Sequence, residues 1–465
     1  MMAVLGGFML PHPPLIIPEI GRGQEREIKN TIEAYHKAAK EIAELQPDTI
    51  VVISPHTDIY ADYFHVSPGN TASGDFRKFG ARQVSVNAKY DTEFVRNLCR
   101  LAELLDFPLG VLGEKSEKLD HATMIPLYFV NQYITGYRLV RMGFAGLSPT
   151  ENYQAGQMLQ QTAAGLLRNV VVIGSGDLSH CLKKEGPYGY QKEGPLYDER
   201  IMDVMGRGAF GELFEFSEHF CDKAGECGQR SFLVMAGALD GMELKKEKLS
   251  YEGPFGVGYG ICTYHVTGED ESRRLLQWYE REKTKEAILK KRCEDAYTRL
   301  ARMALEHYVE TGDILCEPQG LPDEMMRERA GVFVSIHKHG KLRGCIGTIT
   351  PVCKNIAKEI IQNAVSAGNK DPRFQRVKKE ELGMLEYSVD VLQKPEPVDS
   401  LSELDVKEYG VIVSKGRQRG LLLPDLKGVD TAEEQVAIAK QKAGISGDDS
   451  VELERFRVVR HGDKT

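Results

Sequence analysis

The sequence contains no uninterrupted run of about 18 apolar residues, so we expect no membrane-spanning helix and no membrane partner. The N-terminal stretch MMAVLGGFMLPHPP has no basic region and does not resemble a signal peptide. There is no CxxC pair, and nine cysteines without framework spacing favour reduced thiols in a cytoplasm. Positive charge is not in excess, because 60 Lys and Arg stand against 68 Asp and Glu, so we expect no nucleic-acid partner.

The first 265 residues alternate short apolar runs with helical patterns. This alternation predicts an α/β domain, with a central, mostly parallel sheet covered by helices on both faces. The expected strands are Ala3–Met9, Thr49–Ser54, Phe107–Leu112, Tyr137–Gly143, Val170–Gly174, Lys248–Glu252 and Gly258–Val266, and the expected helical regions are Gln24–Leu45, Thr92–Leu105, Asn152–Leu167 and Tyr197–Asp240.

Residues 267–290 are highly charged and favour a helix, which predicts a solvated linker between domains at 1–266 and 291–465. In the second domain, strands and helices do not alternate strictly, so we expect a smaller α+β fold. Its expected helices are Glu294–Thr311, Asn355–Ala367 and Thr431–Lys442, and its expected strands are the two in GVFVSIHKHGKLRGCIGTI around Gly340 and those near Leu385–Leu392, Gly410–Ser414, Gly420–Leu423 and Val451–Val459.

Three histidines directly follow expected strands of the first domain. His12 lies in LPHPP, His56 in SPHTD and His180 in SGDLSH. Ligands of open α/β sheets bind beyond the carboxyl ends of the strands, so these imidazoles should meet at one edge. Neutral imidazole suits first-row divalent metals, and two histidines with one carboxylate form the site of non-haem Fe(II) oxygenases. The residues alone leave the carboxylate open among Asp58, Asp120, Asp177 and Glu226.

The series PHPP, SPH, LDHATMIPL, SGDLSH and GE, in that order over residues 1–265, resembles the class III extradiol ring-cleavage dioxygenases of the LigB-like superfamily. The resemblance implies that His12, His56 and Glu226 hold Fe(II), with Zn(II) or Mn(II) as alternatives. It also implies that His180 is an acid/base residue and that His121 contacts substrate or oxygen. The implied reaction is an oxidation of a catechol-like aromatic diol by O2.

Two alternatives to ring cleavage stay open. The superfamily also contains the Memo proteins, which share the fold without established dioxygenase activity and carry a cysteine in place of the carboxylate. Glu226 points to the dioxygenase branch, although Cys227 lies beside it. The domain could therefore be a Memo-like metal-binding scaffold, and two histidines with a glutamate would also suit a Zn-dependent hydrolase.

The segments LRGCIG, NAVSAGNKDPRF and GLLLPDL, within residues 290–462, resemble the AMMECR family. AMMECR and Memo-type domains are companions of a radical-SAM protein in microbial systems, so the resemblance implies such a partner. Cys345, between the two glycines of LRGCIG, has two readings: a nucleophile activated by a nearby base, or, as we expect, a small buried hydrophobe. A homo-oligomer also stays open.

Overall fold

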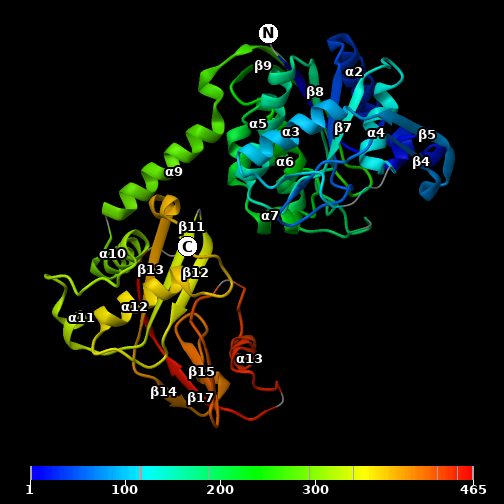
Figure 1. Ribbon diagram of the computed structural model, residues 1–465. Coiled ribbons are helices and arrows are strands. Elements are labelled where there is room, and N and C mark those ends of the chain that lie inside the picture. Colours follow the sequence, from blue (N-terminus) through cyan, green and yellow to red (C-terminus); the bar gives the residue numbers. More distant parts are fainter. Residues whose placement is uncertain are drawn as a thin grey trace. The chain divides into compact units, whose positions relative to one another are not determined.

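The computed structural model describes residues 3–462, except residues 114, 116, 117, 187, 293, 339, 427 and 448. The chain forms two compact units, Met1–Tyr279 and Glu280–Thr465, with the boundary inside helix α9 (Leu275–Arg292) (Figure 1). The first turns of α9 belong to the first unit, where Leu276 is buried in the core. The segment expected as a linker therefore begins inside ordered structure, because strand β10 extends to Glu269.

A six-stranded sheet forms the centre of the first unit, in the order β7-β2-β8-β1-β10-β9. Strands β7, β2, β8 and β1 are parallel, and β10 and β9 add an antiparallel edge. This arrangement confirms the expected α/β class. The strands are β1 (Val4–Leu10), β2 (Thr49–Ile53), β7 (Arg138–Met142), β8 (Val170–Ser175), β9 (Met242–Glu252) and β10 (Tyr259–Glu269).

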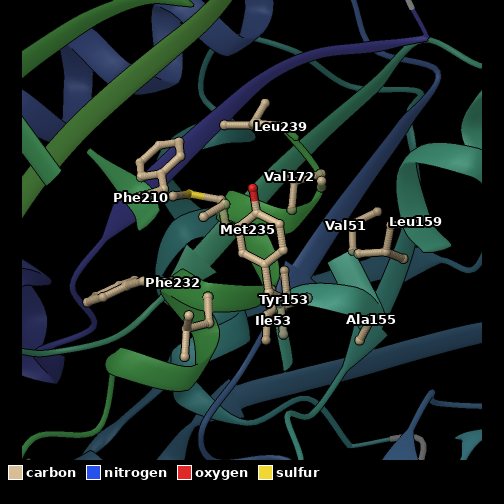
Figure 2. Packing of buried hydrophobic residues seen from close by; sticks show 14 of the residues in the cluster. Val51, Ile53, Tyr153, Ala155, Leu159, Val172, Phe210, Phe232, Met235 and Leu239 are labelled. Carbon is tan, nitrogen blue, oxygen red and sulfur yellow. The ribbon is translucent and has the colours of Figure 1, made fainter. Parts of the chain in front are cut away.

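Both faces of this sheet are buried, since successive side chains of a strand point to opposite faces. In β2, Val51 and Ile53 join one apolar cluster, whereas Ile50 and Val52 join the other. Helices α3 (Thr92–Leu104), α5 (Pro149–Leu166), α6 (Glu193–Arg207) and α8 (Gln229–Gly237) contribute to the first cluster, and α2 (Lys29–Leu45) and α4 (His121–Val130) to the second. Figure 2 shows part of the first cluster, in which side chains of β2, β8, α5 and α8 meet.

Two local features of the first unit differ from the expectation. The expected strand Phe107–Leu112 is reduced to β6 (Leu109–Gly110), which pairs with β3 (Phe64–His65) outside the central sheet. A hairpin of β4 (Thr71–Phe76) and β5 (Ala81–Lys89) was not predicted. Its first strand, TASGDF, contains a glycine and an aspartate, which weaken the signal of an alternating strand.

The second unit contains two four-stranded antiparallel sheets, which confirms a smaller α+β domain. One sheet has the order β12-β11-β13-β18 and the other β14-β17-β15-β16. The elements are α10 (Ala296–Thr311), α11 (Asp323–Arg327), β11 (Val332–Lys338), β12 (Lys341–Gly347), α12 (Ile356–Asn369), β13 (Leu385–Leu392), β14 (Glu396–Val398), β15 (Gly410–Lys415), β16 (Gln418–Leu422), α13 (Ala432–Ala443), β17 (Glu452–Phe456) and β18 (Val458–His461). The last expected strand, Val451–Val459, is thus two strands in different sheets.

Eight cysteines are free thiols in the described part of the chain. Over the same residues, no helix is both long and apolar enough to cross a membrane.

Candidate metal centre

His12 and His56 meet at the carboxyl edge of the parallel strands, as their positions after β1 and β2 predict. Their ring centroids are 4.9 Å apart. The Nδ1 atom of His12 lies 3.1 Å from the hydroxyl of Ser175, and that hydroxyl donates its hydrogen to the carbonyl of Ala122 at 2.7 Å. The hydroxyl oxygen must then accept from His12, so Nδ1 carries the proton and Nε2 keeps a free lone pair.

The third member of this group is Cys227. Its Sγ atom is 3.6 Å from Nε2 of His12, and one potential ligand atom each of His12, His56 and Cys227 lie within 4.8 Å of one another. Two glycines allow this approach: a Cβ atom on Gly176 would lie 2.2 Å from the Cα atom of Gly228. The loop after β8 therefore packs directly on the segment that carries Cys227.

Glu226, the carboxylate expected among the ligands, is not part of this group. Its Oε2 atom accepts a hydrogen bond of 2.6 Å from the backbone amide of Gln229, at the start of α8. Burial raises the pKa of Glu226 to about 7. The side chain lines a small cavity with Arg230 and Cys221. A ligand role for Glu226 stays a prediction, and the geometry brings its neighbour Cys227 to the histidines instead.

His121 lies beside the pair, as the resemblance implies for an active-site histidine. Its ring stacks on that of His56, with centroids 4.4 Å apart and an interplanar angle of 26°. His121 is the first residue of α4, whose N-cap is Asp120, which accepts from the amide of Thr123 at 2.9 Å. Because Asp120 caps the helix, the imidazole of His121 is free for another role.

His180 contacts the segment before α8. Its Nδ1 atom hydrogen-bonds to the carbonyl of Gly225, which can only accept, so Nδ1 carries the proton. The Nε2 atom is then free to accept a proton. Burial lowers the pKa of His180, and the ring of Tyr188 meets it edge-on with a centroid distance of 5.0 Å.

The electrostatics of the site favour neutral imidazoles. Burial lowers the pKa of His12 well below its usual value, and the nearby charges of His56, His121 and His180 lower it further. Burial likewise lowers the pKa of His121 to about 4 and raises that of Asp177 to about 7. Neutral imidazoles and a thiol are the forms from which transition-metal ligands are made, so the residues fit a metal ion.

The family model described as the catalytic LigB subunit of aromatic ring-opening dioxygenase matches residues 6–262. The chain belongs to the LigB family. A second model, AMMECR1, matches residues 298–461. The chain thus consists of an N-terminal LigB domain and a C-terminal AMMECR1 domain, as the sequence motifs indicated. The histidine pair lies at the edge of the LigB domain where the parallel strands end.

Similar proteins differ in how much of this chain they match. A protein of Clostridium acetobutylicum is 42% identical over 468 residues, which cover 99% of each chain. A protein of Thermotoga maritima is 51% identical over 170 residues, covering 36% of this chain and 98% of its own. The crystal structure of an uncharacterized protein from Pyrococcus horikoshii is 33% identical, covers 35% of this chain and 88% of its own, and has a TM-score of 0.34.

Proposed function

We propose that the LigB domain binds one first-row transition metal through His12, His56 and Cys227, and that this centre is a catalytic site. The observation that carries the proposal is the gathering of these three side chains within 4.8 Å at the carboxyl edge of the sheet. Imidazole suits iron, zinc and copper, and a thiolate adds a preference for soft metals. Fe(II) and Zn(II) are therefore better candidates than Mn(II), which favours oxygen ligands.

The proposed reaction is the oxidation of a small aromatic diol, consistent with membership of the LigB family. When bound, the metal would act as a Lewis acid on a coordinated hydroxyl group. The free Nε2 of His180 is the base that would accept the hydroxyl proton, and its lowered pKa keeps the imidazole neutral near pH 7. His121, stacked on His56, is placed to orient the substrate or to donate a hydrogen bond to it.

The test is metal analysis after anaerobic purification, followed by measurement of O2 uptake with a panel of catechols. We expect about one metal ion per chain, lost in His12→Ala, and O2 uptake that is strongly reduced in His180→Gln while the metal is retained. A fall of about 100-fold in turnover is typical when a general base is removed. Absence of O2 uptake by metal-loaded protein with every catechol would reject the oxidation.

A second candidate function is favoured by Cys227 itself. The superfamily branch with a cysteine at this place is the Memo branch, so the domain would be a metal-binding scaffold that works with the AMMECR1 domain and a radical-SAM partner. This candidate predicts the same metal content, no O2 uptake, and capture of a radical-SAM protein when the tagged chain is isolated from its own cells.

A further inference from the structure

The AMMECR1 domain contains a cavity of about 610 Å³ between its two sheets. One wall comes from β11, β12, β13 and β18, and the other includes residues of β16 and α13. Small-molecule sites are typically concave, mainly apolar and supplied with a few polar groups, often where two packed substructures meet. This cavity has those properties, and the LigB centre does not account for it.

The strand alternation of β11 determines which side chains enter the cavity. Val334 and Ile336 are fully buried in the core on one face, whereas Phe333 and Ser335 line the cavity on the other. In the sheet register, Ser335 lies opposite Cys345 of β12, and its hydroxyl donates to Sγ of Cys345 at 3.3 Å. The thiol thus belongs to the wall of the cavity.

The two glycines of LRGCIG explain why Cys345 faces this space. A Cβ atom on Gly344 would lie 2.2 Å from the carbonyl oxygen of Ala367, because α12 packs closely on that face of β12. A Cβ atom on Gly347 would lie 2.2 Å from Cγ of Phe333. Cys345 points away from the helix and is half-buried, which differs from the expected small buried hydrophobe.

Two cationic side chains, Lys442 and Arg373, line the cavity together with this thiol. Among the described residues, Lys442 of α13 has no hydrogen-bond or ion-pair partner. Burial lowers its pKa, the nearby thiol of Cys345 opposes this shift, and the charge of Arg373 adds to it. Arg373 donates through Nε and Nη2 to Asp371 and to the carbonyl of Cys345, but within the described chain its Nη1 atom donates to no group.

The wall of the cavity contains a third cationic residue, Arg460, which has an acidic partner. Arg460 pairs with Asp390, with Nε 2.7 Å from Oδ1, so its charge is already compensated. Arg373 is likewise paired with Asp371, and Asp425 also lines the cavity. The cavity therefore offers an incoming anion N–H donors without a partner, at Lys442 and at Nη1 of Arg373, and not a net positive charge. Phe333 and Leu421 provide apolar surface for the remainder of such a molecule.

We propose that this cavity binds a small organic anion, with its anionic group on Lys442 and Arg373 and its apolar body against Phe333 and Leu421. The anionic group is a carboxylate or a phosphate, since both accept hydrogen bonds from ammonium and guanidinium groups. Bound there, the molecule covers the thiol of Cys345. The inference does not depend on the chemistry of the LigB domain.

The binding test uses the full chain and the fluorescent probe 8-anilinonaphthalene-1-sulfonate, which is apolar and anionic. We expect the dissociation constant at this site to rise about tenfold in Lys442→Met, the size of one lost charge-assisted contact. Lys394→Met, a change at an exposed lysine that does not line the cavity, should leave binding unchanged. Equal binding by both variants and by the original chain overturns the proposal.

Competition experiments distinguish whether the charge or the apolar body of the ligand is recognised by the cavity. Benzoate should displace the dye, whereas neutral benzamide should not, and inorganic phosphate shows whether an anion suffices without an apolar body. Displacement by benzamide as effective as that by benzoate would reject a role for charge. Displacement by benzoate but not by phosphate would support an amphipathic carboxylate, and displacement by both would support the cationic pair as the main contact.

A second readout follows the thiol directly. Iodoacetamide labelling of Cys345, measured by mass spectrometry of the peptide that contains it, should slow at least threefold when benzoate is saturating. Cys316 is exposed and does not line the cavity, so its labelling is the internal control. Unchanged labelling of Cys345 at saturation would contradict binding in this cavity, whatever the dye reports.

Discussion

The Sγ atom of Cys227 lies 3.6 Å from Nε2 of His12, although 215 positions separate the two residues in the sequence. The contact forms because the loop after β8 and the segment before α8 approach each other at Gly176 and Gly228. This contact makes Cys227 the third ligand of the proposed centre, in place of the expected Glu226. The difference can be tested, since a thiol and a carboxylate change the behaviour of a metal site in distinct ways.

Replacing the two neighbouring residues separately tests the ligand set. Cys227→Ser should reduce metal content by at least 10-fold, because a hydroxyl is a poor ligand for soft metals. Glu226→Gln should retain the metal, since its carboxylate contacts the amide of Gln229 and not the histidines. Metal per chain is measured by plasma mass spectrometry.

Cys99→Ser, which alters a half-buried thiol outside the group, is the matched control and should leave metal content unchanged. If Glu226→Gln loses the metal while Cys227→Ser retains it, the assignment of Cys227 is wrong and the carboxylate set implied by the sequence motifs is correct.

The pH dependence of metal affinity gives an independent way to distinguish a Cys227 ligand from a Glu226 ligand. Burial, together with the charges of Asp177 and Glu226, raises the pKa of Cys227 well above its usual value, so metal binding must release the thiol proton. The histidine ligands have lowered pKa values and are already neutral near pH 7. Affinity for Co(II) should therefore rise about tenfold per pH unit between about pH 7 and pH 8.5, with a thiolate-to-cobalt charge-transfer band.

A carboxylate ligand would behave differently. The pKa of Glu226 is about 7, so a site that used it would gain little affinity above that pH. A flat affinity between pH 7.5 and pH 8.5, together with absence of the charge-transfer band, would exclude thiolate ligation.

In the AMMECR1 domain, Asp371 should stabilise the fold as a charged group. It is 4% exposed, and its carboxylate accepts from the amide of Cys345 at 2.9 Å and from Arg373. Asp371→Asn should lower the free energy of unfolding of this domain by about 2 kcal/mol at pH 7. Hydrogen exchange of β11 and β12 peptides measures the change, and Asp399→Asn, at an exposed position, should have almost no effect.

The same contribution should depend on pH in a defined direction. The hydrogen bonds from Arg373 lower the pKa of Asp371 from 3.8 to about 2. The unfolded chain therefore takes up the proton first, and the stabilisation is complete above pH 4 and is lost as the pH falls towards 2. The difference between the original chain and Asp371→Asn should narrow over that interval, and a constant difference would contradict a charged role.

Glycine replacement tests the packing of LRGCIG. Gly344→Ala should lower the free energy of unfolding of the AMMECR1 domain by about 2 kcal/mol or more, because the new methyl group would meet the backbone oxygen of Ala367. Gly383→Ala is the matched control: no atom lies within 4 Å of its added Cβ, so stability should change by less than about 1 kcal/mol. Equal effects in the two variants would contradict the close approach of α12.

The positions of His12 and His56 followed from the sequence because they depend on one robust rule: parallel strands deliver the residues after them to one edge. The choice between Glu226 and Cys227 could not be made in this way. Both lie in a short irregular segment between α7 (Glu218–Ala224) and α8, where no periodicity fixes side-chain direction. The glycines at 176 and 228 were the only hint in the sequence of this close approach, and they can be interpreted only when the contact between them is known.

The cavity of the AMMECR1 domain could not be predicted from the sequence either. The alternation in β11 indicates that Ser335 and Phe333 share a face, but the wall opposite them comes from β16 and α13, about 90 residues later. The division of the last expected strand into β17 and β18 arises from the same packing, because the two halves join different sheets.

In the part of the chain that the structure describes, the boundary inside α9 separates the apolar clusters of the two domains: the buried apolar residues of the LigB domain end at Leu276, and those of the AMMECR1 domain begin at Tyr297. Heating such a chain should give two calorimetric events, so no single melting temperature describes it. A metal ion at His12 would raise only the melting temperature of the LigB domain by mass action, and a small anion beside Cys345 only that of the AMMECR1 domain. The melting temperature of each domain therefore reports the binding of that domain's ligand alone.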